Sequence, residues 1–132
     1  MPSTTSSPSL AVAGRFIDAL AARDFDGVVA TLTDDVRFRA LLPSRTLDLE
    51  GRQAVRATFD TWFGDTGRWE LVEAVVGEVG GRLHIRWRAS VTKPPAGTGN
   101  LLVEQQIYAD AGPDGRLRDV SLLCTGFRPD QP

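Results

Sequence analysis

The chain has 132 residues, a formal net charge of −2 and a hydrophobic content of 42%. This length suits one ordinary domain with a buried core and is short for two. Lysine and arginine are spread among aspartate and glutamate without a basic block, and the apolar runs are far shorter than the roughly 20 residues that span a bilayer. We therefore expect a soluble protein with no nucleic-acid partner and no membrane partner.

The two ends of the chain and its cysteine content suggest where the protein works. The opening MPSTTSSPS has neither a positive charge nor an apolar stretch, so residues 1–8 are expected to be a disordered leader and not a signal peptide. Residues 9–128 then form a single domain, and residues 129–132 form a disordered tail. Cys124 is the only cysteine, which excludes an intrachain disulfide and fits a reducing, cytoplasmic location.

Apolar residues recur at helical spacing in three segments. The first predicts a helix over residues 9–22. A second, shorter helix follows Asp24, which stands where an N-cap residue belongs. The third runs from Gly51 to about Gly64. Each of these helices has one apolar stripe to bury against another layer.

Apolar and polar residues alternate in the rest of the chain, which indicates strands. Residues 36–42 predict a strand that is followed by a polar loop over residues 44–50. Asp34 and Asp35, just before this strand, suggest a turn and not a catalytic pair of carboxylates. Four more strands joined by hairpins are expected over about residues 69–76, 83–91, 101–110 and 117–127.

This order resembles the nuclear transport factor 2-like, or SnoaL-like, superfamily over residues 9–128. The resemblance rests on Arg23-Asp24-Phe25-Asp26, Asp34-Asp35-Val36-Arg37-Phe38 and Gly51-Arg52-Gln53-Ala54-Val55. It implies an α+β fold in which a curled antiparallel sheet wraps around N-terminal helices into a cone, a cystatin-like or NTF2-like roll of order α-α-β-α-β-β-β-β. It also implies a hollow interior for a hydrophobic ligand. The superfamily includes isomerases, polyketide cyclases, dehydratases, epoxide hydrolases and binding modules, so the fold alone does not assign a reaction.

The ketosteroid isomerase branch of this superfamily uses a carboxylate on the first strand as a base and two acidic hydrogen-bond donors for the enolate oxygen. The base position falls on Ala40 in this chain, and the donor positions fall on Phe16 and Gln105. None of these side chains can act as an acid or a base near neutral pH. That mechanism is therefore not expected, and we assign no catalytic residue.

Strand alternation predicts which side chains face the interior. If Trp87, Gln105 and Cys124 point inward, then Glu104 and Asp119 point outward. The inner face of the strands then carries no carboxylate, unless a β-bulge reverses the direction of the residues beyond it.

Gln105 and Cys124 are the only polar side chains that this alternation places on the inner face. Gln105 is our first choice for orienting a ligand, and the alternative is that it satisfies a buried backbone group. Cys124 fits a small buried hydrophobe better than a nucleophile. The expected pocket residues are Phe16, Leu20, Phe38, Ala40, Phe59, Trp62, Trp87, Val103, Gln105 and Cys124.

The outer face of the sheet is the expected site of self-association. His84, the only histidine, is predicted to point outward in a row with Arg86 and Arg88. An arginine-rich and aromatic row suits a homodimer interface, and a solvated face is the alternative. No glycine-rich phosphate loop, clustered metal ligands or Schiff-base lysine is evident, so we expect no cofactor and no metal.

Three functions stay open. The first is a SnoaL-like protein that binds a small apolar molecule in the cone pocket. The second is an isomerase, polyketide cyclase or dehydratase-type enzyme of secondary metabolism, which would act through positioning by Gln105 and a bound water or through a carboxylate that the alternation misplaces. The third is a non-catalytic homodimeric interaction module.

Overall fold

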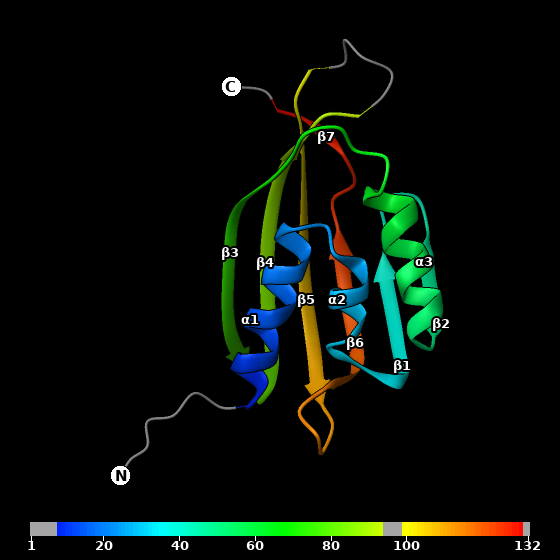
Figure 1. The fold of residues 1–132 in the computed structure, drawn as a ribbon, viewed down its shortest axis with the longest axis vertical. Helices are drawn as coiled ribbons and strands as arrows, with labels where there is room; N and C mark the ends of the chain where they lie inside the picture. The colour runs from blue at the N-terminus through cyan, green and yellow to red at the C-terminus, as the bar shows by residue number, and fades with distance from the viewer. Residues whose placement is uncertain (1–7, 94–98, 131–132) are drawn as a thin grey trace.

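The computed structural model describes residues 8–93 and 99–130. Within them the chain forms α1 (Pro8–Ala21), α2 (Phe25–Val29), β1 (Leu32–Leu41), β2 (Thr46–Glu50), α3 (Arg52–Phe63), β3 (Trp69–Val79), β4 (Arg82–Val91), β5 (Leu101–Ala111), β6 (Leu117–Cys124) and β7 (Arg128–Pro129). The helices lie together on one face of the sheet (Figure 1). The predicted α+β class, with N-terminal helices against a curled sheet, is confirmed.

The sheet is mixed, whereas a fully antiparallel one was expected. Its strands follow the order β2-β1-β6-β5-β4-β3, and β7 pairs with β5. The pairing of β1 with β6 is parallel, and every other pairing is antiparallel. The parallel pair forms because the chain leaves β1 through β2 and α3, builds the meander of β3, β4 and β5, and then returns beside β1 as β6.

Strand β2 lies where a polar loop was predicted over residues 44–50, so that prediction is wrong. Its side chains alternate between exposed and half-buried positions. The half-buried Leu47 and Leu49 are paired in register with Ala40 and Phe38 of β1. This alternation covers only five residues, and Asp48 between the two leucines and Glu50 after them made the segment resemble a polar loop.

Asp34 and Asp35 lie inside β1, so the predicted turn at this pair is also wrong. The register between β1 and β6 shifts between Leu32 and Arg37, and the aspartates occupy that irregular stretch. Asp34 Oδ1 lies 3.0 Å from Arg52 Nη1. An irregular and exposed stretch of strand accommodates two adjacent carboxylates, because neither of them has to enter the core.

The two ends of the domain differ from the expected boundaries. Of the expected leader, only Pro8 lies within the described residues, as the first residue of α1. Pro129 belongs to β7, which pairs with the start of β5, and the amide of Asp130 donates to the carbonyl of Asn100 at 3.0 Å. The first two residues of the expected disordered tail, Pro129 and Asp130, therefore pair with the start of β5 and the residue before it. Residues 131–132 lie outside the described residues.

A cluster of aromatic rings joins the helices to the sheet. Phe59 of α3 is only 1% exposed and stands at the centre of this cluster. Its ring centroid lies between 5.6 and 6.4 Å from those of Phe16, Phe25, Phe38, Trp62 and Phe63. These neighbours come from α1, α2, β1 and α3, so Phe59 holds the two layers together.

Arg23 ties the turn between α1 and α2 to the loop between α3 and β3. Its φ of 53° lies in the left-handed region, and its Nη1 donates to both the carbonyl oxygen and the Oγ1 of Thr66 at 2.7 Å. We expect Arg23→Ala to lower the free energy of unfolding by about 1–2 kcal/mol through the lost hydrogen bonds. Arg23→Gly should lower it less, because glycine adopts a positive φ without strain. Urea denaturation of both variants measures the difference, and a glycine variant no more stable than the alanine variant would contradict this reasoning.

Candidate functional site

The face of the sheet that the helices cover carries its side chains in cross-strand rows. The register places Trp87 of β4, Gln105 of β5 and Cys124 of β6 side by side in one row. The flanking rows are apolar and consist of Ile85, Ile107, Leu122 and Ala40 on one side and of Ala89 and Val103 on the other. We call Trp87, Gln105 and Cys124 the inner row. Within it the polar atoms of Trp87 and Gln105 are buried among apolar neighbours.

All ten residues that the sequence predicts for the pocket lie in the core or against it. Trp62 and Cys124 are partly buried and pack against the core. The buried ones are Phe16, Leu20, Phe38, Ala40, Phe59, Trp87, Val103 and Gln105. The structure divides this set into the cluster around Phe59 and the inner row.

Phe63 connects these two groups, and sequence reasoning did not single it out for the pocket. Its ring centroid lies 5.9 Å from that of Phe59 and 5.6 Å from that of Trp87. Trp69 and Phe127 also contact it, with centroids at 5.2 and 6.1 Å. Phe63 follows Phe59 by four residues, one helical turn, so the spacing could have placed it on the same face of α3.

Gln105 has the most unusual environment of the inner row. It is fully buried, and within the described chain neither its Oε1 nor its Nε2 has a hydrogen-bond partner. The same holds for Nε1 of Trp87, its cross-strand neighbour. Native proteins pair nearly all of their buried polar groups, and an unpaired one costs about 1–3 kcal/mol. The alternative reading, in which Gln105 satisfies a buried backbone group, is wrong for the described residues.

Cys124 lies where the inner row reaches the protein surface. Its Sγ accepts a hydrogen bond from the amide of Gly126 at 3.4 Å. It also takes part in a groove of about 500 Å³ whose other lining residues are Pro43, Arg88, Leu102, Glu104, Thr125 and Arg128. The thiol is thus partly exposed at the end of the row, and Gln105 is enclosed beside it.

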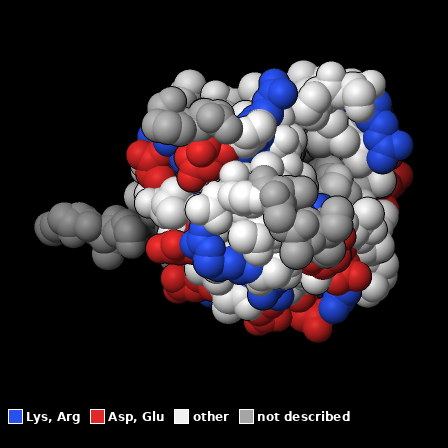
Figure 2. Space-filling model, turned by 90° about the horizontal axis from the view of Figure 1, so that it is seen from above, with Lys and Arg blue, Asp and Glu red and all other residues white. Residues whose placement is uncertain are grey.

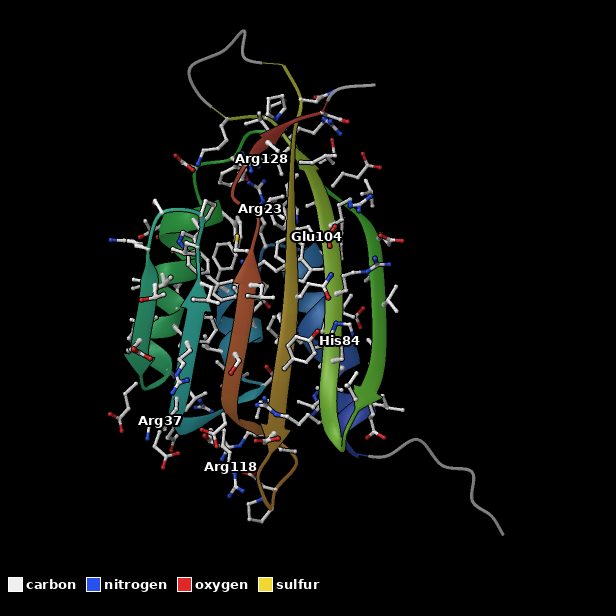
Figure 3. The ribbon with its side chains drawn as sticks, turned by 180° about the vertical axis from the view of Figure 1, so that it is seen from behind. Arg23, Arg37, His84, Glu104, Arg118 and Arg128 are labelled. Carbon is white, nitrogen blue, oxygen red and sulfur yellow. The ribbon has the colours of Figure 1, made fainter. Side chains whose placement is uncertain are left out.

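The carboxylates whose direction was in question face away from the helices, as the alternation predicted. Glu104 lies on the outer face in Figure 3, where its Oε1 accepts hydrogen bonds from Nη2 and Nε of Arg88 at 2.8 and 3.1 Å. Asp119 lines an outer groove with Asp110, its partner across β5 and β6. Within the described residues, no aspartate or glutamate is buried. The inner face therefore offers no carboxylate for acid–base chemistry there.

His84 also points outward, as predicted, and ends a hydrogen-bonded chain across β4 and β5. Its Nε2 lies 2.8 Å from Oε1 of Gln106, and Nε2 of Gln106 donates to Oε2 of Glu104 at 3.0 Å. Because an amide oxygen only accepts, Nε2 of His84 carries the hydrogen in this arrangement. Tyr108 stacks on the imidazole with ring centroids 4.8 Å apart. The only histidine of the chain thus belongs to the outer face and not to the inner row (Figure 3).

The hydrogen bond from Arg88 holds the pKa of Glu104 below its usual range; burial opposes this effect and a hydrogen bond from Gln106 adds to it. Since the folded pKa is the lower one, the ionised carboxylate stabilises the fold above the unfolded pKa of about 4.3. That contribution is lost as the pH falls through the folded pKa. We expect Glu104→Gln to be less stable than the parent chain at neutral pH and the difference to shrink toward about pH 3. Urea denaturation across this range checks it, and a difference that does not change with pH would argue against it.

Two grooves cross the outer face above β1, β2 and β6. One has a volume of about 450 Å³ and is lined by Leu41, Leu123 and Tyr108 among others. Leu41 and Leu123 are register partners and remain 52% and 45% exposed. The other groove, of about 750 Å³, is mostly charged and includes Arg37, Arg39, Asp48, Glu50, Arg82, Asp110 and Asp119.

Charges of both signs are interspersed on the face that Figure 2 shows, without a dominant patch of one sign. Among the described residues, no three His, Cys, Asp or Glu side chains form a group that could hold a metal ion. No helix within residues 8–93 and 99–130 is long and apolar enough to cross a membrane. The inner row therefore remains the strongest candidate site of the described chain.

Comparison with known proteins agrees with this architecture. The sequence profile of the SnoaL-like domain matches residues 13–116. None of the curated proteins compared with the chain matches it in sequence. The profile thus spans both helical and strand regions of the fold, including most of the inner row.

Several solved structures have the same fold. A proposed polyketide cyclase from Xanthomonas campestris pv. campestris aligns with a TM-score of 0.71 at 18% identity, over 88% of this chain and 89% of that one. A steroid delta-isomerase from Pseudomonas aeruginosa aligns with a TM-score of 0.64 at 17% identity, over 98% and 85%. An NTF2-like protein of unknown function from Burkholderia pseudomallei K96243 reaches 0.71 at 18% identity, over 89% and 90%. At such low identities the likeness extends to the fold alone.

Proposed function

Because the chain belongs to the SnoaL-like domain family, we propose that it binds a small apolar molecule between its helices and the inner face of its sheet. The observation that carries this proposal is the buried amide of Gln105, which has no hydrogen-bond partner in the described chain and lies on an otherwise apolar face. Small-molecule sites are typically apolar with a few polar groups that fix the orientation of the ligand.

Binding is favoured over acid–base catalysis by the side chains of the inner face. Catalysis of proton transfer needs a group that can take up or release a proton near neutral pH. No buried residue within the described chain is an aspartate, glutamate, histidine or lysine. An isomerase or cyclase reaction is the second candidate, since a steroid delta-isomerase and a proposed polyketide cyclase share the fold. In that case Gln105 would act by positioning the substrate or a water.

Calorimetric titration of the full chain with tetralin, a neutral bicyclic hydrocarbon, tests the binding proposal. We expect saturable binding of one molecule per chain. Two variants locate the site, because the adjacent residues 40 and 41 lie on opposite faces of β1. Ala40→Val, which enlarges a buried side chain of the inner face, should weaken binding, and Leu41→Ala on the outer face should leave it unchanged. Absence of saturable binding, or sensitivity to Leu41→Ala alone, would contradict the proposal.

We also propose that the chain forms a homodimer through the outer face of its sheet. The exposed pair of Leu41 and Leu123 supports this, and the nearby ion pair of Arg39 and Asp48 at 3.4 Å supplies charges of both signs to the same groove. A surface with apolar and oppositely charged parts can be complementary to a second copy of itself across a two-fold axis.

The oligomeric state in solution checks the homodimer. We expect the parent chain to elute as a dimer in size-exclusion chromatography with light scattering, and Leu123→Asp to elute as a monomer because the introduced charge would be desolvated in the interface. Gln53→Asp, an exposed position on the helical side of the sheet, should remain dimeric. A monomeric parent chain at high protein concentration would contradict the proposed dimer.

A further inference from the structure

We infer that the two copies of the proposed homodimer are related by a two-fold axis that runs along β1 and β6 and places Arg37 of each copy opposite Asp119 of the other. This inference rests on the proposed homodimer and specifies which residues of the two copies meet. It follows from the register of β1 and β6 and from the charges that these strands carry in the outer groove.

Strands β1 and β6 present matched side chains on the outer face at three levels. The strands are parallel and adjacent, and Arg37 is labelled near the lower end of β1 in Figure 3. The residues between these levels are buried on the helical side, so the three levels face outward. The register pairs, from one end to the other, are Arg37 with Asp119, Arg39 with Ser121 and Leu41 with Leu123. The strand pair therefore has a charged level at one end and an apolar level at the other.

The charges of the first level are poorly matched within one chain. Asp119 is the register partner of Asp110, and like charges directly opposite each other destabilise a sheet. Arg82 pairs with Asp110 at 2.9 Å. The one ion pair of Asp119 within the described residues joins it to its sequence neighbour Arg118, at 4.0 Å. Arg37 makes no ion pair with any described residue, so both Arg37 and Asp119 have charge left for a partner.

A two-fold axis that lies between two facing sheets and parallel to these strands exchanges β1 with β6 and keeps each residue at its level. Arg37 then faces the partner's Asp119, and the same rotation brings Asp119 opposite the partner's Arg37. At the apolar level Leu41 faces the partner's Leu123, again in both directions. Such reciprocal contacts are what an isologous interface requires. One axis therefore matches the charged level and the apolar level at the same time.

The four charges around this axis alternate in sign. Each Arg37 lies beside Asp119 of its own chain and opposite the partner's Asp119, so that like charges occupy the diagonals. Packed sheets lie about 10 Å apart, a separation that a facing arginine and aspartate bridge together. Aligned sheets cross at about 30°, so the contacts are closest near the axis. Farther out, Glu50 comes opposite the partner's Asp110, which holds Arg82 in the same groove.

The other in-plane orientation of the axis is unfavourable. A two-fold perpendicular to the strands and centred on the same three levels would place the charged level of one copy against the apolar level of the other. Arg37 would then be desolvated against Leu41 of the partner without a countercharge. The charges thus select the axis that runs along the strands.

Charge reversal at the two positions tests this arrangement. Arg37→Asp surrounds the axis with four carboxylates, and Asp119→Arg surrounds it with four guanidinium groups. The double variant Arg37→Asp/Asp119→Arg restores the alternation. Arg15→Asp and Asp18→Arg carry the same charge changes at exposed positions of α1, on the helical side of the sheet, and are the matched controls. Sedimentation equilibrium measures dimerisation of each full chain, and circular dichroism confirms that each variant is folded.

We expect each single reversal to weaken dimerisation at least about tenfold, and the double reversal to return it to within about threefold of the parent chain. Both controls should dimerise as the parent chain does. An equimolar mixture of the Arg37→Asp and Asp119→Arg chains should form a heterodimer. In that pair the introduced aspartate faces the introduced arginine, and the unchanged Asp119 of one chain faces the unchanged Arg37 of the other.

The outcomes separate this arrangement from the homodimer itself. If the parent chain is a dimer and the single reversals dimerise equally well, the assigned axis is wrong, and the homodimer then depends on the result for Leu123→Asp. The axis is also wrong if either the double reversal or the mixture fails to recover the dimer. A monomeric parent chain would contradict the homodimer and this arrangement with it.

Discussion

We expect Phe59→Ala to lower the free energy of unfolding by about 3–5 kcal/mol. The ring is almost completely buried and contacts five other aromatic rings from three helices and β1. Alanine would leave a cavity between the two layers that the surrounding rings fill only in part, because they are held in place by their own neighbours. Domains are stable by about 5–15 kcal/mol in total, so this one substitution would remove a large part of the free energy of unfolding.

Urea denaturation followed by circular dichroism measures the effect of Phe59→Ala. Thr61→Ala, an exposed position two residues further along α3, should change the free energy of unfolding by less than about 0.5 kcal/mol. A loss below about 1 kcal/mol for Phe59→Ala would mean that the helices and the sheet are not joined through this ring.

The second large effect is a gain in stability. We expect Gln105→Leu to raise the free energy of unfolding of the ligand-free chain by about 1–3 kcal/mol, because leucine has a similar size and leaves no unpaired amide in the core. Gln106→Leu should lower it, since this substitution removes hydrogen bonds to His84 and Glu104 on the outer face. The adjacent glutamines thus give changes of opposite sign.

The stability gain bears on function when it accompanies a loss of binding. Residues kept at the expense of stability are typical of functional sites, where a buried polar group serves a ligand and not the fold. If Gln105→Leu instead lowers stability as much as Gln106→Leu does, the amide stabilises the folded chain and the argument from its missing partner is wrong.

The sequence predicted the structure best in segments where apolar residues recur with the period of a helix or a strand over at least two turns or several alternations. The helical spacing around Phe16 and Phe59 and the two-residue alternation through Trp87 and Gln105 placed these side chains on the faces that the structure shows. Such patterns report a local conformation and the face that is buried. They are strong here because both helices and strands have one side in the core.

Features that depend on contacts distant in sequence were not predictable in this way. The parallel pairing of β1 with β6 joins strands that are separated in the chain by β2, α3, β3, β4 and β5, and no local period encodes it. Strand β2 was too short and too charged for its alternation to stand out. The missing partners of Gln105 could not be inferred either, because they depend on which atoms the neighbouring strands and helices bring to the amide.

An NMR titration of the chain labelled with 15N-tryptophan, with tetralin as the ligand, decides whether the inner row is a ligand site. The Trp87 indole N–H is the reporter, since it has no partner in the described chain, and the Trp69 indole N–H, already bonded to the Leu20 carbonyl, is the reference. We predict a saturable shift of the Trp87 resonance at one molecule per chain while the Trp69 resonance stays in place. A Trp87 resonance that does not move at saturating tetralin would contradict binding of an apolar molecule at this row.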